Sequence, residues 1–322
     1  MNGEVNLENR IDLPIIVGPT ASGKSALALA IAEEIGGEIV SCDSMQIYKR
    51  MNIGTAKPTK EELARVPHHM IDIAEPWENF SCADYARLAD EAISDIISRG
   101  KTPIVCGGTG LYLDALLRGG LPEAADSDEE YRAELCAFLE REGAEKLHAM
   151  LAEVDPESAE AIHMNNTKRV IRALEIYHTS GRKKSELDKE NNKIDGKYRP
   201  LAVGLFYPDR SVLYDRIDQR VDIMIKEGLL DEVKALEAEG VFKRSKTASA
   251  AIGYKELLGY LHGEAGLEES VEFLKMATRR YAKRQCTWFF AKDYVNKIEI
   301  NPPFDKKTFE KSVKNAKKVF QF

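Results

Sequence analysis

Features that would place a protein in a membrane or an oxidising compartment are missing from this sequence. No stretch of its 322 residues approaches the ~20 consecutive apolar residues that a membrane-spanning helix needs, so we expect no membrane partner. The opening segment, MNGEVNLENRIDLP, lacks a basic region followed by an apolar one, which predicts a short lead-in and not a secretory signal peptide. We therefore expect a cytoplasmic protein.

Cysteine is scarce and carries no metal-binding pattern. The five cysteines include no C-x-x-C pair, and their odd number favours reduced thiols over a disulfide framework or a zinc site. Cys42 and Cys106 each end an apolar stretch, where a small residue packed in the core is expected. The proportions of hydrophobic (43%) and charged (31%) residues are ordinary, which predicts a globular protein with a sizeable core.

Positive charge is also in deficit, but the charge is unevenly distributed. The net charge of −7 taken alone argues against a nucleic-acid partner. Between Glu123 and Glu160 there are thirteen acidic and three basic residues, whereas between Asn165 and Arg199 there are ten basic and five acidic ones. The charge therefore lies in blocks, and one acidic segment sets the overall sign.

The most informative pattern that is present is the octet GPTASGKS at residues 18–25. It matches the phosphate-binding loop G-x-x-x-x-G-K-[ST] and lies between an apolar stretch, residues 13–17, and a strong helix former, residues 26–32. In such a loop main-chain N–H groups bind an anion, Lys24 reaches the outer phosphate, and the Ser25 hydroxyl holds Mg²⁺. The predicted phosphate-binding residues are Gly18, Pro19, Thr20, Ala21, Ser22, Gly23, Lys24 and Ser25.

The first ~120 residues alternate between apolar strands and helices in the manner of an α/β protein. Strands are predicted at residues 13–17, 38–42 and 102–106, and helices at residues 84–98 and 111–117. Strands that run into glycine loops and helices favour a parallel, doubly wound sheet, in which ligands bind outside the carboxyl ends of the strands. We therefore expect Gly18, Asp43 and Gly107, which lie at three strand ends, to face one crevice.

Strand patterns disappear between residues 120 and 199, which predicts a helical domain inserted into a P-loop α/β core. Helices are expected at residues 128–142, 145–153, 156–162 and 167–179, followed by a polar, loop-like tract at residues 185–197. Residues 201–206 return as a strand, and helices follow at residues 210–226, 230–239, 268–290 and 306–322. The predicted domains are a catalytic core of residues 11–119 and 200–322 and a helical insertion of residues 120–199.

Asp43 begins a run of polar side chains close to the phosphate loop. A carboxylate at the end of a strand can act as a general base or bind Mg²⁺ through water, and it can equally cap a helix. The run DSMQIY, residues 43–48, adds a hydroxyl, an amide and a phenol, and an amide such as that of Gln46 can pair with adenine. Thr109, which follows two glycines, can bind a phosphate oxygen or a base, or cap a helix.

Basic residues recur at the four-residue spacing that places them on one helix face. They are Lys168 and Arg172 with Arg169 beside them, Arg216 and Arg220, and the stripe Lys275, Arg279 and Lys283. Two guanidinium groups on one face suit a diphosphate, and a basic stripe suits the phosphate backbone of a nucleic acid. A solvated surface is the competing interpretation. The adjacent His68 and His69 diverge on a helix or a strand, so a shared metal is not expected.

Taken together, these segments resemble the bacterial tRNA dimethylallyltransferases, also called tRNA isopentenyltransferases. The resemblance covers nearly the whole chain and rests on an ordered set of motifs: GPTASGKS, DSMQIY, MNIGTAKP at 51–58, VPHHMID at 66–72, GGTGLY at 107–112, AIGYKE at 251–256 and YAKRQCTWF at 281–289. It implies transfer of a dimethylallyl group from dimethylallyl diphosphate to the exocyclic N6 amine of an adenine. That adenine lies just 3′ of the anticodon in tRNAs that read codons starting with U.

The resemblance also implies roles for individual residues. Asp43 would be the base that takes a proton from the amine, Thr109 would contact the substrate, and Arg220 would stabilise the leaving diphosphate. Mg²⁺ would be held by Ser25, and by Asp43 through water. The implied contacts with the tRNA anticodon stem-loop are Asp43, Ser44, Met45, Gln46, Thr109, Lys168, Arg169, Val170, Ile171, Arg172, Arg279 and Lys283. The adenine would have to leave its stack to reach the crevice.

Two segments depart from the family pattern, and other functions remain open. Thr167-Lys168-Arg169 stands where relatives often have Gln-Arg, and Phe290 stands where TWFR would place an arginine. A P-loop small-molecule kinase or ATPase is the alternative, since it too would have the octet and a strand that ends in an aspartate. Prenylation of free adenine nucleotides and RNA binding without catalysis are two others. We expect a monomer, although no sequence pattern fixes the oligomeric state.

Overall fold

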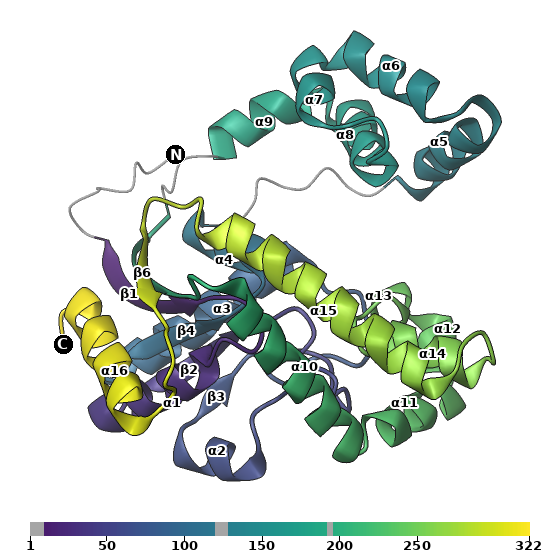
Figure 1. Cartoon of the computed structure of the whole chain (residues 1–322). Helices are drawn as coiled ribbons and strands as arrows, with labels where there is room; N and C mark the ends of the chain where they lie inside the picture. Colours follow the sequence, from purple (N-terminus) through teal and green to yellow (C-terminus); the bar gives the residue numbers. More distant parts are fainter. Residues whose placement is uncertain (1–9, 120–127, 192–195) are drawn as a thin grey trace. The chain divides into compact units, whose positions relative to one another are not determined.

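A computed structural model of the chain describes residues 10–119, 128–191 and 196–322 (Figure 1). The chain divides into two compact units, one made of the residues up to Leu117 with Lys197–Phe322, and the other of Arg118–Gly196. The lead-in residues 1–9, and residues 120–127 and 192–195 of the predicted insertion, lie outside the described residues. None of the helices in the described ranges combines the length and the apolar character that a membrane crossing requires.

The first unit is built on a six-stranded sheet with the strand order β3-β2-β4-β1-β5-β6, in which all neighbouring strands are parallel. The strands are β1 (Ile11–Val17), β2 (Glu38–Cys42), β3 (His68–His69), β4 (Pro103–Gly107), β5 (Tyr198–Phe206) and β6 (Val295–Glu299). The residues of β2 and β4 are all buried, as expected for strands covered on both faces. The predicted α/β class with a parallel sheet is confirmed.

The register of the strands brings three loops together at one edge of the sheet. Val17 pairs with Gly107, and Gly107 pairs on its other side with Cys42. These residues are the last of β1, β4 and β2, so the loops that begin at Gly18 and Asp43 emerge beside the loop that follows Gly107. The predicted meeting of these loops follows from that register.

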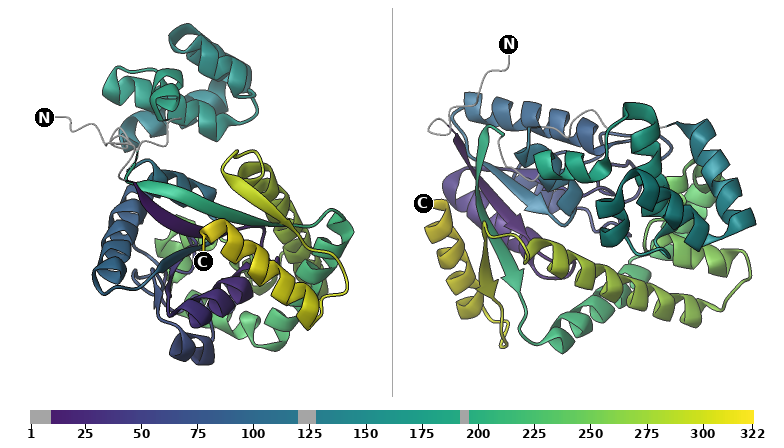
Figure 2. Two further views of the ribbon diagram at one scale, coloured as in Figure 1. Left: turned by 90° about the vertical axis from the view of Figure 1, so that its left-hand side faces the viewer. Right: turned by 90° about the horizontal axis from the view of Figure 1, so that it is seen from above.

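Helices cover both faces of the sheet (Figures 1 and 2). On one face lie α1 (Lys24–Ile35) and α16 (Lys306–Phe320), and on the other lie α3 (Cys82–Ser98) and α4 (Gly110–Leu117). Capping chemistry fixes where several of them begin. Before α3, the Ser81 hydroxyl accepts from the Asp84 N–H while the Asp84 carboxylate accepts from the Ser81 N–H, a complete capping box.

Two long helices reach the loops at the carboxyl edge of the sheet, α10 (Arg210–Lys226) and α15 (Leu267–Phe289). Beside them, a second apolar core packs residues 47–51 against short helices. These are α11 (Leu229–Ala238), α12 (Val241–Arg244), α13 (Lys246–Ser249) and α14 (Tyr254–Leu261). The sequence did not predict α2 (Lys60–Arg65), α12, α13, α14, β3 or β6, because such short segments carry too few residues for a visible period.

The described part of the second unit is helical. Its helices are α5 (Glu129–Glu142), α6 (Ala144–Val154), α7 (Pro156–Ala161), α8 (Thr167–Ser180) and α9 (Lys184–Asn191). They enclose their own apolar core, which includes Leu135, Leu147, Leu151, Val170 and Leu174. The core gives α5, α6, α7 and α8 one buried face each, as an amphipathic pattern requires.

The helix α9 corrects the predicted loop over residues 185–191, while residues 192–195 of that prediction lie outside the described residues. Ser185 donates to the buried Asp155 carboxylate from its hydroxyl at 2.6 Å and from its N–H at 2.9 Å. Burial alone would raise the pKa of Asp155, but hydrogen bonds from Ser158 and Ser185 outweigh it and the pKa is lowered. The polar composition of the segment therefore hid a helix that is anchored by one buried polar contact.

Candidate active site

The predicted phosphate loop turns tightly between β1 and α1. The backbone angle φ is +148° at Gly18 and +93° at Gly23, values that favour glycine. A Cβ at Gly18 would also meet the Ser22 Oγ at 3.1 Å. Because α1 begins at Lys24 without a side-chain cap, the N–H groups of its first turn are available to an anion, and the helix dipole favours negative charge there.

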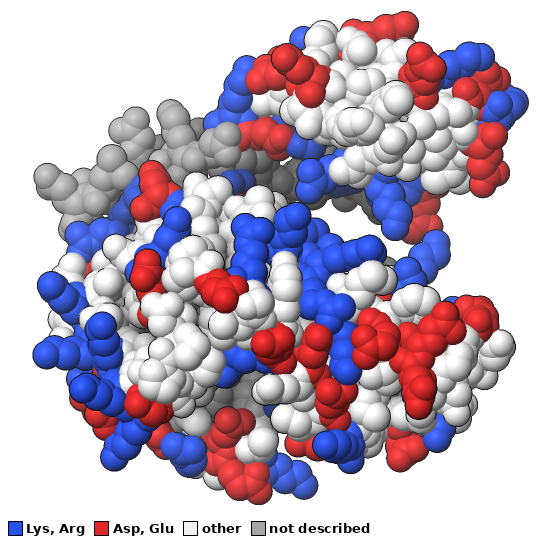
Figure 3. Space-filling model, in the orientation of Figure 1, with Lys and Arg blue, Asp and Glu red and all other residues white. Residues whose placement is uncertain are grey.

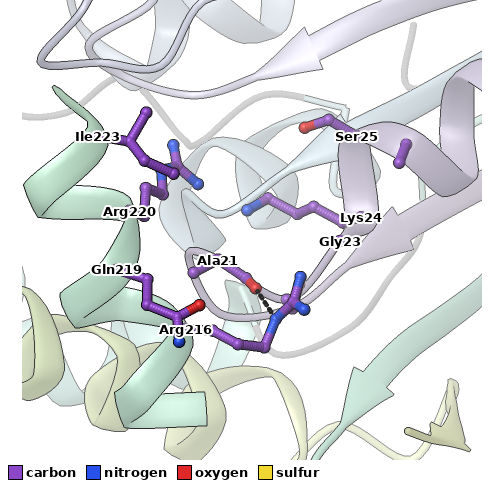
Figure 4. Close-up of a pocket in the computed structure, with 10 residues that line it drawn as sticks. Ala21, Gly23, Lys24, Ser25, Arg216, Gln219, Arg220 and Ile223 are labelled. Atoms are coloured by element: carbon purple, nitrogen blue, oxygen red, sulfur yellow. Dashed lines mark hydrogen bonds between the residues drawn. The ribbon is translucent and has the colours of Figure 1, made fainter. Parts of the chain in front are cut away.

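A cavity of about 300 Å³ lies against this loop and includes two arginines of α10 (Figure 4). It is lined by Ala21, Ser22, Gly23, Lys24, Ser25, Ala26, Arg216, Gln219, Arg220 and Ile223. The Arg216 Nε donates to the Ala21 carbonyl at 3.0 Å, and its guanidinium stacks over the Phe304 ring. Figure 4 shows the Lys24 ammonium and the Arg220 guanidinium pointing into the same space.

The electrostatics of this cavity favour a multiply charged anion. Burial lowers the pKa of Lys24 and Arg220 lowers it further, while Cys106 and Asp43 act in the opposite direction. Burial likewise lowers the pKa of Arg220, and the charge of Asp43 opposes that shift. Two cations held close together and partly away from water favour added counter-charge, which a diphosphate would supply.

A second cavity, of about 350 Å³, joins the phosphate loop to Asp43. The two cavities share Lys24, Ser25 and Arg220. The apolar wall of the second cavity includes Met45, Ile217, Val221, Met224, Leu229, Ile252 and Leu274. A cationic end, an apolar wall and a carboxylate thus border one space, which suits an anion with a short hydrocarbon tail and an acceptor that must lose a proton.

Asp43 caps a turn instead of a helix. Its Oδ1 accepts from the main-chain N–H of Met45 at 2.9 Å and of Gln46 at 3.3 Å. These two bonds hold the carboxylate in place at the wall of the second cavity. The general-base interpretation and the capping interpretation are therefore compatible, because one oxygen caps the turn while the group still borders the cavity.

Thr109 contacts Ser44, the residue that follows Asp43, and so holds the loop that carries the carboxylate. The Thr109 Oγ1 accepts from the Ser44 N–H at 3.0 Å and lies 3.4 Å from the Ser44 Oγ. Among the described residues that line the second cavity, Thr109 is absent whereas Ser44 and Asp43 are present. In this structure Thr109 therefore contacts Ser44, which borders the cavity, and its implied contact with the substrate stays a prediction.

The MNIGTAKP segment forms part of the cavity wall and is held from two sides. The Gln46 Nε2 donates to the carbonyls of Thr55 and Ala56, each at 3.1 Å, so both amide protons are used within the protein. The Glu232 carboxylate accepts from the Gly54 N–H at 3.1 Å, and from further main-chain N–H groups of the same loop. Glu232 was missed from the sequence because its role depends on a contact between distant segments.

The predicted RNA-binding run on α8 divides into surface and core residues. Lys168 and Arg169 are exposed, but Val170 and Ile171 are buried in the core of the helical unit at 0% and 7% exposure. Helix periodicity turns these two apolar side chains inward, so only Lys168 and Arg169 of the four present a side chain to solvent, and the implied tRNA contacts of the run stay predictions.

Arg172, the last residue of that run, has a structural partner. Its Nη1 donates to the Glu175 carboxylate at 2.7 Å, and Arg132 donates to both oxygens of the same group. Glu175 is fully buried, and although burial would raise its pKa, Arg132 and Arg172 outweigh that effect and the pKa is lowered. Of the two residues expected on one helix face, Arg172 is thus paired within the protein, whereas Lys168 is exposed.

The basic stripe on α15 is partly neutralised as well. The Arg279 Nη1 lies 2.6 Å from the Asp218 carboxylate, and Lys275 pairs with Asp222 and Glu272. Lys283 of the stripe is exposed, as are the neighbouring Arg280 and Arg284, and we call these three residues the α15 basic patch. Figure 3 shows basic side chains gathered along this helix.

The adjacent histidines each have a partner within the protein. The His69 Nε2 lies 2.8 Å from the buried Glu38 carboxylate, and the His68 Nδ1 lies 2.8 Å from the Val66 carbonyl. Across the part of the chain that the structure describes, no cluster of three or more His, Cys, Asp or Glu side chains could hold a metal ion. The five cysteines are free thiols.

The phosphate loop and Arg220 border the same cavity as the Asp43 carboxylate, and Arg216 lines the adjoining cavity. This arrangement defines a class: P-loop proteins in which an anion site borders a group able to take a proton. The chain belongs to the IPP transferase family, whose sequence model matches residues 46–292. A model for isopentenyl transferases matches residues 11–77.

Named relatives and solved structures agree with this assignment. The tRNA dimethylallyltransferase of Bacillus licheniformis is 51% identical over 92% of this chain and 93% of its own length. The solved tRNA isopentenylpyrophosphate transferase of Bacillus halodurans is 43% identical, with 97% of this chain and 99% of that chain covered and a TM-score of 0.67. The solved structure of a eukaryotic dimethylallyltransferase acting on tRNA is 31% identical. The match covers 94% of this chain and 77% of that chain, with a TM-score of 0.77. The expected family is confirmed, and it is favoured over the kinase alternative.

Proposed function

We propose that this chain transfers the dimethylallyl group of dimethylallyl diphosphate to the exocyclic N6 amine of an adenine and releases diphosphate. The acceptor is the adenine just 3′ of the anticodon in tRNAs that read codons starting with U. The observation that supports this most directly is the shared cavity, where Lys24 and Arg220 border the same space as Asp43. The names of the relatives support tRNA as the acceptor.

The diphosphate binds at the first turn of α1, between Lys24 and Arg220. As the bond from the allylic carbon to oxygen breaks, negative charge grows on the leaving group, and donors already fixed in place stabilise that charge without reorganisation. Arg216 is one such donor, because its bond to the Ala21 carbonyl and its stacking on Phe304 hold the guanidinium beside the loop.

Asp43 takes the proton that the amine loses as the new carbon–nitrogen bond forms. An exocyclic amine of adenine is a weak nucleophile, because its lone pair is delocalised into the ring, so proton removal during attack lowers the barrier. The N–H groups of Met45 and Gln46 orient the carboxylate. Thr109 contributes by holding Ser44, the next residue, in position.

Ser25 and Asp43 suit a Mg²⁺ ion. A hydroxyl and a carboxylate are hard oxygen donors, and both line the cavity that holds the cations for the diphosphate. Mg²⁺ takes only one or two protein oxygens beside phosphate oxygens and waters, which fits a direct ligand at Ser25 and a water-mediated one at Asp43. When bound, the ion neutralises charge on the leaving diphosphate.

The anticodon stem-loop binds to exposed basic side chains. On the helical unit these are Lys168 and Arg169, and on the first unit they include Lys283 of the α15 basic patch, with Arg279 as a paired neighbour. The adenine leaves its stack to reach Asp43, where Ser44, Met45 and Gln46 form the nearby wall. We expect the protein to act as a monomer in the cytoplasm.

The test is direct transfer of label. Purified protein is incubated with Mg²⁺, radiolabelled dimethylallyl diphosphate and unmodified tRNA, and label is sought in the RNA. We expect label in tRNA, little with AMP as the acceptor, and none with Lys24→Ala, whereas Lys60→Ala, an exposed lysine outside both cavities, serves as the matched control. Absence of label from tRNA with the unaltered protein would contradict the proposed function.

A further inference from the structure

Gln285 of α15 joins two loops of the active site through one buried amide. The side chain is 5% exposed. Its Oε1 accepts from the Thr20 N–H of the phosphate loop at 2.8 Å, and its Nε2 donates to the Gly108 carbonyl at 2.9 Å. An amide is the neutral side chain that offers a donor and an acceptor at the same end, so it satisfies both main-chain groups at once.

The loop after β4 is shaped to receive this helix. A Cβ at Gly108 would lie 2.2 Å from the Gln285 Nε2, and a Cβ at Gly110 would lie 2.2 Å from the Trp288 Nε1. Both distances are far below van der Waals contact, so the GGTG segment lets α15 rest directly on the main chain. The glycines of this motif thus serve a helix contact, which places the amide of Gln285 between the two loops.

Hydrogen bonds continue from Gly108 to the proposed base. The N–H groups of Gly108 and Thr109 both donate to the carbonyl of Cys42, the residue before Asp43, at 3.1 Å. Thr109 also accepts from the Ser44 N–H at 3.0 Å, on the other side of Asp43. The residues that flank the carboxylate are thereby fixed to the loop that Gln285 binds.

We propose that Gln285 is a positioning residue that fixes the phosphate loop relative to Asp43, and so sets the alignment of donor and acceptor for transfer. The inference rests on the proposed function. Gln285 sits at the cavity wall, but its amide is used by the two loops. Group transfer needs the reacting atoms held in a near-attack arrangement, and a displacement of about 1 Å can slow such a step about 10²-fold.

Two variants separate positioning from general stability. Gln285→Met keeps a side chain of similar length and removes both hydrogen bonds, while Gln285→Glu keeps an acceptor for Thr20 and sets a carboxylate oxygen against the Gly108 carbonyl. Tyr198→Phe is the control, because Tyr198 donates to Asp90 at 2.6 Å in the same unit and lines neither cavity. It therefore loses a hydrogen bond of comparable kind away from the site.

The measurements are the single-turnover rate of label transfer at saturating substrates, the KM for tRNA and for the diphosphate donor, and the melting temperature. We expect both Gln285 variants to lower the single-turnover rate by about 10- to 10²-fold with the KM for tRNA changed less than about 3-fold. Tyr198→Phe should lower the melting temperature with the rate unchanged.

The outcomes are distinguishable. Unaltered protein that labels tRNA, together with Gln285 variants that match its rate, would overturn the positioning role alone. A rate loss in the variants no larger than that in Tyr198→Phe would overturn it equally. Unaltered protein that labels no tRNA would overturn the proposed function and this inference with it. If one of the two Gln285 variants loses its cooperative melting transition, the comparison uses the other Gln285 variant.

Discussion

Replacement of Asp43 by asparagine isolates the chemistry of its carboxylate from its structural role. The Oδ1 of Asp43 accepts from the N–H groups of Met45 and Gln46, and the amide oxygen of an asparagine accepts both bonds equally well. Asp43→Asn therefore keeps the turn and removes only the basic oxygen and its charge. Asp43→Ala removes the cap as well, which costs about 1–3 kcal/mol of stability on top of the chemical loss.

The size of the effect follows from the role that the structure allows. A positioned general base contributes about 10²–10⁴-fold to a proton transfer, which is about 3–5 kcal/mol of barrier. With Mg²⁺ at saturating concentration, binding of the donor should not weaken. The charge of Asp43 opposes the pKa shifts of Lys24 and Arg220, so its removal leaves the positive charge of both side chains available to the diphosphate. The expected signature is a slow chemical step with an unchanged or lower KM for dimethylallyl diphosphate.

The assay is single-turnover transfer of label to tRNA with the enzyme in excess and both substrates saturating. The melting temperature of Asp43→Asn, compared with that of the unaltered protein, reports whether the turn is kept. A single-turnover rate within about threefold of the unaltered protein would refute the base assignment, since general-base removal costs at least about 10². A loss confined to tRNA affinity would make Asp43 a binding residue.

Four further results are expected. Lys24→Ala should abolish transfer while tRNA still binds in a filter assay. Lys168→Ala combined with Arg169→Ala should make the slope of log Kd against log salt shallower by about 1.5, because two phosphate contacts are lost. Arg172→Ala should lower the free energy of unfolding by about 1–3 kcal/mol in denaturant titration, since the buried Glu175 loses a partner. The lowered pKa of Glu175 means that its charged form stabilises the fold above the ordinary value of 4.5. The stability difference from Glu175→Gln should therefore shrink progressively as pH falls from that value through the lower pKa of the folded state.

Each of these results has a contradicting outcome. If Lys24→Ala transferred the label at the rate of the unaltered protein, Lys24 would have no role in the reaction. An unchanged salt slope would mean that Lys168 and Arg169 face solvent when tRNA is bound. Unaltered stability in Arg172→Ala would show that Arg132 alone satisfies Glu175, and a pH-independent difference for Glu175→Gln would mean that the carboxylate does not change its pKa on folding.

Local patterns sufficed to predict the strands β1, β2, β4 and β5 and the position of the loops that follow them. The stretch at residues 38–42 was predicted as a strand with the bounds that the structure gives β2, and the octet placed the turn before α1 correctly. Once the sheet was expected to be parallel, the meeting of Gly18 and Asp43 followed from geometry, because carboxyl ends of parallel strands share an edge. These features depend on short segments whose period or composition is visible in the sequence.

Side-chain partners were beyond the reach of such patterns. The spacing of Lys168 and Arg172 places them on one helix face, but it does not reveal that Arg172 bonds a buried Glu175. The same holds for Arg279, whose partner Asp218 lies on a different helix. Gln285 and its partner Thr20 in the phosphate loop are 265 residues apart in the sequence, and only the folded arrangement brings them together.

The position of β1 between β4 and β5 has a consequence for synthesis of the chain on the ribosome. Until Tyr198–Phe206 emerges, β1 can pair with β4 alone and leaves one row of N–H and C=O groups open. A nascent chain that stalls within Arg118–Gly196 therefore carries an apolar template for strand addition by another molecule. Slower translation through that segment should therefore lower the amount of protein that accumulates without aggregation.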